Sequence, residues 1–254
     1  MPAGYEVLPL IYDRWQKTYG ADYSSLILPR LLATLRCHHS PTTTMVDIAC
    51  GTGTLALMMA QRGWTVWGVD ASERMVNEAQ QKIRGKRWAV TILRQDMRAI
   101  SLPVKVGLAT SMFDSVNHIL TRRDLLRVFR GVHRTLEPGG QFIFDVNNEL
   151  CFERLWTRTE TVNHRDFTII MQNRYERTRK MAYSFVTIFL RSGTRYQRLR
   201  EIVRERCFAH KEVHDLLEEA GFVVIEGEDF NFTTTPDIGK IKTWWVARKP
   251  WTQP

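Results

Sequence analysis

One pattern is repeated along residues 42–150: a short apolar run, a polar or glycine-rich turn, and then an amphipathic stretch. The apolar runs, which resemble strands, lie at residues 45–50, 65–70, 88–93, 104–112 and 141–146. Amphipathic stretches at 54–61, 72–83 and 121–136 separate them, with Ser72 predicted to cap the second and Thr121 or Asp124 the third. Strands separated by helices are typical of a parallel sheet with helices on both faces. The pattern therefore predicts an α/β fold.

The pattern changes after residue 148. Three long strand-like runs, at 165–175, 181–190 and 195–207, are joined by short polar segments and predict an antiparallel meander. A helix at 210–220 and strands at 222–226 and 242–247 then return to the first pattern. Because the later strands complete the main sheet, the meander is expected to be an insertion into one domain.

The excess of positive charge is confined to this insertion. The chain has 36 Lys+Arg against 27 Asp+Glu, a net charge of +9. Residues 154–211 contain fourteen of the basic residues and five of the acidic ones, so the rest of the chain is neutral. A basic patch permits an anionic partner but does not establish one.

The composition excludes several classes of protein. A hydrophobic content of 44% is ordinary for a globular chain and argues against disorder. No apolar run approaches the ~20 residues needed to span a bilayer, and residues 1–9 lack a signal-peptide pattern. The four cysteines have no paired spacing, which fits free thiols in a reducing compartment. We therefore expect a cytoplasmic protein with no membrane partner.

Three features suited to a ligand follow three successive predicted strands. The Gly51-Thr52-Gly53 turn lets a ligand approach the backbone closely, at a helix N-terminus that favours negative charge. Asp70 ends the second strand, where a carboxylate can accept hydrogen bonds from both hydroxyls of a ribose. Asp96 and Met97 follow the third strand, where they could contact an adenine amine and ring. Carboxyl ends of parallel strands share one edge, so these features predict one binding crevice.

In order and spacing, these motifs resemble those of the class I S-adenosylmethionine-dependent methyltransferases. The matching segments are the glycine loop 46–54, Val69-Asp70-Ala71-Ser72, Gln95-Asp96-Met97 and Leu136-Glu137-Pro138-Gly139-Gly140. The closer similarity is to small-molecule members with an antiparallel insertion after the fifth strand, including sugar N,N-dimethyltransferases of macrolide pathways. One departure is Gly107, where many relatives carry an acidic residue early in the fourth strand.

The resemblance implies a Rossmann-like, seven-stranded methyltransferase sheet with helices on both faces, plus the inserted antiparallel β meander. The core would be residues 41–150 and 209–254, with 151–208 as a lid or interface and helices in 1–40 covering the cofactor cleft. It also implies S-adenosyl-L-methionine as cofactor and S-adenosyl-L-homocysteine as product. The cofactor-binding residues implied are Tyr12, Tyr23, Ala49, Cys50, Gly51, Gly53, Asp70, Ala71, Met75, Asp96, Met97 and Ser111.

The stretch 111–118, after the fourth strand, is expected to border the transferred methyl group. Methyl transfer needs a nucleophile held in line with a free lone pair. His118 is the best candidate for the general base, because its intrinsic pKa lies near neutrality; the alternative is a helix-start residue bonded to backbone. Asp114 could attract an amine or cap the following segment, and capping is favoured. A cationic methyl donor needs no metal, and no metal-ligand spacing is present, so no metal is expected.

Alternative functions depend on other features. A nucleic-acid methyltransferase could track phosphates with the basic insertion, where Arg198, Arg200, Arg204 and Arg206 share one strand face, but the chain lacks an Asn/Asp-Pro-Pro-aromatic motif and a Pro-Cys pair. A dinucleotide-dependent oxidoreductase is suggested by Gly51-x-Gly53-x-x-Ala56, but it leaves Asp96-Met97 without a role. A third possibility is a protein that binds the cofactor without catalysis.

The acceptor stays open between N and O methylation of a small molecule. The insertion could serve a homodimer, or could be a basic lid suited to an anionic substrate such as a nucleotide-linked sugar, with Arg198 and Arg200 contributing to affinity. Four aromatic residues of the insertion could line the substrate pocket, although packing is the expected role for most; they are Tyr175, Tyr183, Phe185 and Tyr196.

Overall fold

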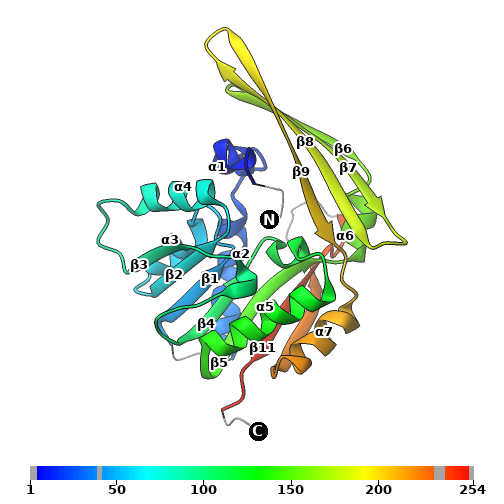
Figure 1. Cartoon of the computed structure of the whole chain (residues 1–254). Coiled ribbons are helices and arrows are strands. Elements are labelled where there is room, and N and C mark those ends of the chain that lie inside the picture. Colours follow the sequence, from blue (N-terminus) through cyan, green and yellow to red (C-terminus); the bar gives the residue numbers. More distant parts are fainter. Residues whose placement is uncertain (1–4, 39–41, 232–237, 252–254) are drawn as a thin grey trace.

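The computed structural model describes residues 5–38, 42–231 and 238–251. Its main element is a seven-stranded sheet in the order β10-β11-β5-β4-β1-β2-β3 (Figure 1). The parallel strands are β1 Thr44–Ile48, β2 Thr65–Asp70, β3 Val90–Arg94, β4 Val106–Ser111 and β5 Leu136–Asn147. The last two, β10 Val223–Phe230 and β11 Lys242–Arg248, pair with each other antiparallel, and β11 also runs antiparallel to β5. The predicted α/β fold is confirmed.

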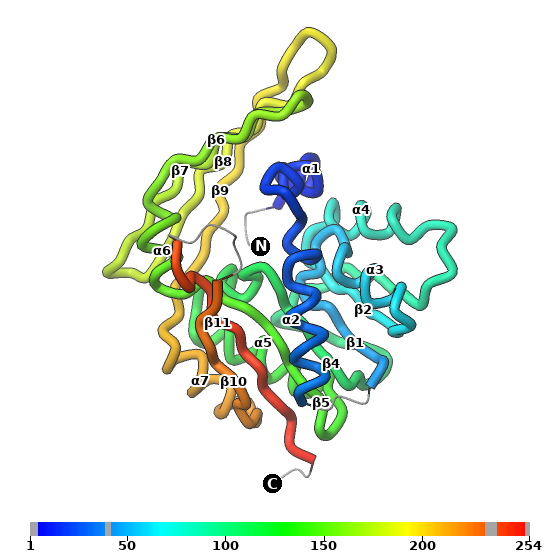
Figure 2. The backbone as a smooth tube through the Cα atoms, turned by 180° about the vertical axis from the view of Figure 1, so that it is seen from behind, coloured from blue at the N-terminus to red at the C-terminus, as the bar shows by residue number. Residues whose placement is uncertain are grey.

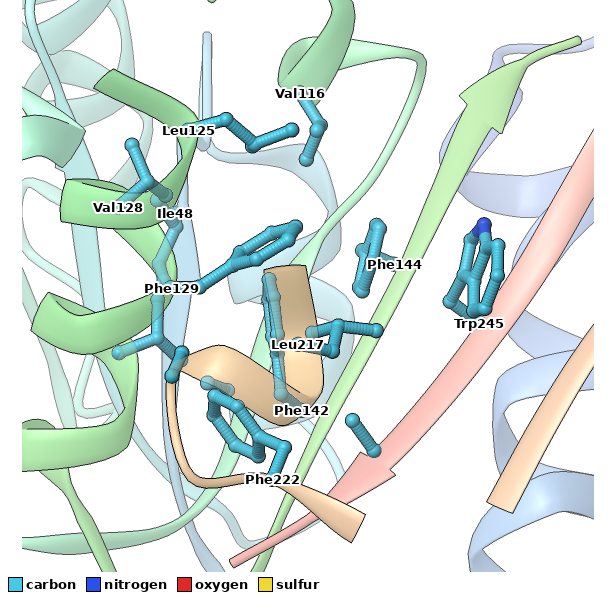
Figure 3. Packing of buried hydrophobic residues seen from close by; sticks show 14 of the residues in the cluster. Ile48, Val116, Leu125, Val128, Phe129, Phe142, Phe144, Leu217, Phe222 and Trp245 are labelled. Carbon is cyan, nitrogen blue, oxygen red and sulfur yellow. The ribbon is translucent and has the colours of Figure 1, made fainter. Parts of the chain in front are cut away.

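Helices cover both faces of this sheet because each strand places alternate side chains on opposite faces. Along β5, Phe142 and Phe144 pack in one apolar layer and Ile143 in the other. The first layer lies under α5 Arg122–Thr135 and α7 His210–Glu219, and Figure 3 shows Phe129 and Leu217 from these helices beside the β5 phenylalanines. The second lies under α2 Tyr23–Cys37 and α3 Thr54–Ala60, and Figure 2 shows α2 along this side.

Two of the helices begin at the predicted caps. Ser72 accepts a hydrogen bond from the Met75 amide at the start of α4 Glu73–Ile83. Thr121, and not Asp124, caps α5, because its hydroxyl accepts from the Asp124 amide. The shorter elements are η1 Leu8–Leu10, α1 Tyr12–Lys17, η2 Met97–Ala99, η3 Ser115–His118 and α6 Glu149–Arg154.

The insertion forms a separate four-stranded antiparallel sheet that projects from the core (Figure 1). Its strands are β6 Thr159–His164, β7 Phe167–Glu176, β8 Met181–Ser192 and β9 Arg195–Arg206. The meander was predicted with three strands, and β6 was missed because its sequence is mostly polar. The N-terminal segment lies against this sheet, where Leu8 and Ile11 pack with Phe167, Ile169 and Val186.

Boundaries differ most at β5. The sequence predicted a helix to residue 136 and a strand from residue 141, but β5 begins at Leu136 and includes residues 138–140. Its pairing with β4 shifts register between Val106 and Leu108. Gly139 has a φ of 78°, a conformation that glycine adopts at no steric cost. All four cysteines are free, as predicted. Among the described residues, no helix combines the length and apolarity needed to cross a membrane.

Candidate active site

A cavity of about 1290 Å³ opens where β1, β2, β3 and β4 end. Because these parallel strands end at one edge, the polar turns that follow them come together there. The sequence-predicted residues that line the cavity are Tyr12, Ala49, Gly51, Asp70, Ala71, Met75, Asp96, Met97 and His118. The predicted crevice therefore coincides with this cavity.

A second cavity, of about 50 Å³, adjoins the first and shares Tyr12, Ala49 and Gly51 with it. Tyr23 and Cys50 line this smaller space, as does Asp47. Burial raises the pKa of Asp47 to about 7, although its carboxyl accepts a hydrogen bond from the Thr110 hydroxyl. The smaller cavity is thus a polar recess beneath the glycine loop.

Two predicted cofactor residues line neither cavity. Ser111 is 1% exposed, and its hydroxyl has no hydrogen-bond partner among the described residues. Gly53, with a φ of 75°, begins α3, and a Cβ placed on it would lie 3.0 Å from that of Ala79 in α4. The missing Cβ of Gly53 therefore allows close packing of α4, and direct contact with a ligand is not supported for these two residues.

The Asp70 carboxylate is oriented by two backbone groups. The Gly51 and Ser72 amides donate to its two oxygens, at 2.9 Å and 2.8 Å. Burial raises the pKa of Asp70, and these hydrogen bonds partly offset that effect. Each oxygen keeps a lone pair for another donor, which is the arrangement that the two hydroxyls of a ribose require.

Asp96 has a partner that the sequence did not indicate. The Arg98 guanidinium donates to both of its carboxylate oxygens, and the Arg98 amide donates to one of them. These bonds from Arg98 hold the pKa of Asp96 below its usual value. Asp96 is therefore a fixed anion at the rim of the cavity, next to Met97.

The turn after β4 has an unusual backbone. Phe113 and Asp114 have φ values of 60° and 51°, a left-handed conformation that costs energy in residues other than glycine. Asp145 of β5 holds the turn, because its carboxylate accepts from the Phe113 amide at 2.7 Å and from the Asp114 amide at 3.1 Å. Phe113 also lines both cavities.

Lys242 of β11 completes this arrangement. Its ammonium donates to Asp114 and Asp145, both at 2.7 Å, and lies over the rings of Tyr23 and Phe113. Burial acts to lower the pKa of Lys242, but the two carboxylates outweigh it and the net pKa is raised. The prediction that Asp114 caps the next helix is wrong: its side chain makes no capping bond and instead pairs with Lys242.

His118 ends η3 beside the cavity. Its Nδ1 lies 3.2 Å from the backbone oxygen of Arg204, and a carbonyl oxygen only accepts, so the neutral ring carries its proton on Nδ1. The Nε2 lone pair then accepts from the Tyr5 hydroxyl at 3.2 Å. Burial lowers the pKa of His118, and the nearby Asp114 opposes this only in part. The imidazole is therefore neutral near pH 7, with its lone pair directed at the Tyr5 hydroxyl, and Tyr5 lines the cavity.

Glu205 of β9 is the other titratable group here that the sequence analysis missed. Its side chain is 3% exposed, and its Oε1 lies 3.9 Å from Nε2 of His118. Burial and the Asp114 charge raise its pKa well above the usual value. Asp114, His118 and Glu205 each place one oxygen or nitrogen atom that could bind a metal ion within 4.8 Å of the other two. The positive charge beside them is the ammonium of Lys242, which pairs with Asp114.

The four arginines of β9 that were predicted to share one face lie in different surroundings. Arg198 and Arg200 are exposed, Arg204 lines the large cavity, and Arg206 pairs with Glu212. Among the described residues that line the two cavities, the four candidate aromatics of the insertion do not occur. Tyr175, for example, stacks on Phe152.

Comparison with known proteins bears on this geometry. Residues 45–140 match the family model described as "Methyltransferase domain". YqeM of Bacillus subtilis (strain 168), provisionally named a methyltransferase, is 29% identical over 180 residues, which are 70% of this chain and 72% of that protein. The dTDP-3-amino-3,4,6-trideoxy-alpha-D-glucopyranose N,N-dimethyltransferase of Streptomyces venezuelae is 27% identical over 53% of this chain and 55% of its own. A crystal structure of an S-adenosylmethionine-dependent methyltransferase from Clostridium acetobutylicum ATCC 824 has a TM-score of 0.80 at 23% identity, covering 97% of this chain and 99% of that one.

Proposed function

We propose that this chain, a class I S-adenosylmethionine-dependent methyltransferase, methylates an amine nitrogen of a small molecule with His118 as the general base. The observation that carries this proposal is the state of the His118 ring. Its Nδ1 proton is engaged by the Arg204 carbonyl, so the basic Nε2 faces the Tyr5 hydroxyl beside the cavity. A neutral imidazole with a directed lone pair is what proton removal requires.

The residues of the two cavities fit S-adenosyl-L-methionine. The oriented Asp70 carboxylate suits the ribose, the apolar Met75 and Met97 suit the adenine, and the polar recess at Tyr23 suits the methionyl end. When bound, the cofactor supplies an electrophilic methyl group on a sulfonium sulfur. The chain then has to bind the acceptor in line, exclude water and remove one proton.

An amine suits this base better than a hydroxyl does. An ammonium group has a pKa of about 8 to 10, so a neutral imidazole can take its proton at modest cost. An alcohol is a far weaker acid, so the transfer of its proton to a histidine whose pKa is lowered by burial costs more free energy. The carboxyl groups of Asp114 and Glu205 beside His118 also favour a cationic acceptor.

The proposed step moves one proton and one methyl group. The ammonium nitrogen of the acceptor gives a proton to Nε2 of His118, which frees its lone pair. That lone pair forms a bond to the methyl carbon while the carbon–sulfur bond breaks and its electron pair stays on sulfur. The acceptor leaves as a methylated ammonium ion, and His118 returns the proton to water.

The Streptomyces venezuelae relative is named as an N,N-dimethyltransferase of a nucleotide-linked amino sugar, which supports nitrogen as the acceptor atom. If the acceptor is anionic, Arg204 is the insertion arginine that lines the cavity. The exposed Arg198 and Arg200 do not line it, which weakens the support for a basic lid. A homodimer through the insertion, the domain boundaries, the absence of a metal and a cytoplasmic location stay predictions.

Two measurements test the proposal. Calorimetric titration should give saturable binding of S-adenosyl-L-homocysteine and none of NAD. A screen with methyl-labelled cofactor should use matched pairs of amino sugars and their hydroxyl counterparts, including dTDP-3-amino-3,4,6-trideoxy-α-D-glucopyranose. We expect label in amines only, and none with His118→Gln. Label in the hydroxyl member of a pair, or full activity of His118→Gln, would contradict nitrogen transfer by this base.

A further inference from the structure

Strand β9 of the insertion lies against η3, the short helix that ends at His118, as well as beside the cavity. Val203 and Arg204 line the cavity, and the Arg204 carbonyl holds Nδ1 of His118. The Arg206 carbonyl accepts from the Asn117 amide group at 2.9 Å. Because alternate residues of a strand point to opposite sides, Glu205 lies with Val203 on the buried side.

The Glu205 carboxyl is held in place by a buried amide. Asn147 of β5 donates to Oε2 of Glu205 at 3.0 Å. Asn117 fixes Asn147 in turn, since its side chain accepts from the Asn147 amide at 2.9 Å and donates to the Asn147 carbonyl at 3.2 Å. These bonds leave Oε1 as the oxygen nearest His118, 3.9 Å from Nε2.

The charges around this oxygen come from several elements. Asp114 lies on the turn, Asp145 on β5 and Lys242 on β11, and the Tyr5 hydroxyl reaches His118 from the N-terminal segment. Asp114, Asp145 and Glu205 thus contribute three carboxyl groups to this cluster, and Lys242 contributes one ammonium group. Burial and the Asp114 charge raise the pKa of Glu205. A positive charge on the imidazole would lie 3.9 Å from the Glu205 carboxyl, and opposite charges this close favour the ionised form of both groups.

We propose that Glu205 is a positioning residue of the transfer reaction, whose carboxyl stabilises the imidazolium that forms on His118 when the acceptor loses its proton. The inference rests on the proposed role of His118 as base. As Nε2 takes the proton from the acceptor ammonium, the ionised Glu205 carboxyl acts as the counter-ion of the imidazolium. The buried group then carries paired charges. The insertion would thus complete the catalytic group.

The direct test is a titration of His118 in the protein saturated with S-adenosyl-L-homocysteine. Imidazole signals of histidine-labelled protein are followed by NMR against pH, and the signal absent in His118→Gln identifies the residue. In Glu205→Gln the midpoint for His118 should fall by about 1 pH unit or more, because an opposite charge within about 4–6 Å favours the charged form. The amide of Gln can still accept from Asn147, so the fold should be kept. Glu176→Gln is the matched control, since Glu176 pairs with Arg174 on the insertion away from His118, and should cause no change.

Kinetics with a methylated amine from the screen gives a second measurement. Glu205→Gln should lower kcat about tenfold or more with KM unchanged, and Glu205→Asp should recover part of the loss. An unchanged His118 midpoint in Glu205→Gln would overturn the inference even if amines are methylated. If no amine is methylated, the proposed function fails, whereas the His118 titration still reports separately on Glu205.

Discussion

The ammonium nitrogen of Lys242 lies 2.7 Å from a carboxylate oxygen of Asp145, and both side chains are almost wholly buried. The same carboxylate holds the left-handed turn at Phe113 and Asp114. One ion pair between β11 and β5 therefore supports the backbone turn at Phe113, a residue that lines both cavities.

Lys242→Met should destabilise the protein by about 3 to 5 kcal/mol, because it leaves buried carboxylates without their cation. Urea unfolding measures this change. Lys211→Met is the control, since Lys211 pairs with Asp215 on an exposed helix surface and should change the free energy of unfolding little. Equal unfolding midpoints for Lys242→Met and the wild type would contradict the assigned ion pair.

Asp70→Asn should weaken binding of S-adenosyl-L-homocysteine about tenfold to a hundredfold, since hydrogen bonds to a charged group are lost. The Gly51 and Ser72 amides donate to different oxygens of Asp70, and in Asn one of these oxygens is replaced by an NH₂ group, which is a donor and cannot accept. Calorimetry gives Kd directly. Asp215→Asn, on α7, should bind as the wild type does, and a wild-type Kd for Asp70→Asn would remove the ribose role of Asp70.

The stability of the ligand-free protein should fall as the pH rises from about 4 to 7, in part because of Asp47. Burial raises its pKa from 3.8 to about 7, so the folded state keeps a proton that the unfolded state loses. The stability from that proton is fully present below the unfolded pKa and is lost as the pH rises through the folded one. Asp47→Asn should remove this loss and gain about 2 to 4 kcal/mol on the wild type between pH 4 and 7. Urea denaturation at pH 4 and at pH 7 measures this. The same difference in free energy of unfolding between Asp47→Asn and the wild type at pH 4 and at pH 7 would rule this out.

The pH dependence of methyl transfer should report His118. Because burial lowers the pKa of His118 from its ordinary value of 6.5, the acid limb of kcat/KM should have its midpoint below 6.5. Activity rises with pH there, since only the neutral ring accepts a proton. His118→Gln should lower kcat about 10²- to 10⁴-fold. A midpoint well above 6.5 would assign the limb to another group.

Arg198→Gln combined with Arg200→Gln should leave the acceptor KM unchanged, because both side chains are exposed and neither lines the cavity. Steady-state kinetics at two salt concentrations measures this. Arg204→Gln should raise KM for an anionic acceptor, and the rise should shrink at high salt, which screens the charge. A large increase in KM from the Arg198 and Arg200 changes would restore the basic-lid hypothesis.

Part of this arrangement was predictable from local sequence. The Thr121 cap and the strand before Gly51 depend on residues that are neighbours in the chain. By contrast, the sequence placed residues 138–140 between a helix and a strand, and only the pairing of Leu136 with Val106 of β4 extends β5 back to Leu136. β6 has little apolar periodicity, and it becomes a strand because β7 offers it hydrogen-bond partners.

The sequence by itself determined the binding crevice, because alternating strands and helices bring the carboxyl ends of parallel strands to one edge, where Gly51, Asp70 and Asp96 follow them. Only the tertiary structure decided what surrounds His118. Tyr5 reaches it from 113 residues away and Arg204 from 86, and Lys242 joins Asp114 across 128. Strand alternation indicates which side of β9 a residue occupies, but the register of a distant strand depends on packing that no local pattern encodes. The crevice was therefore predictable, and the proton chemistry beside it was not.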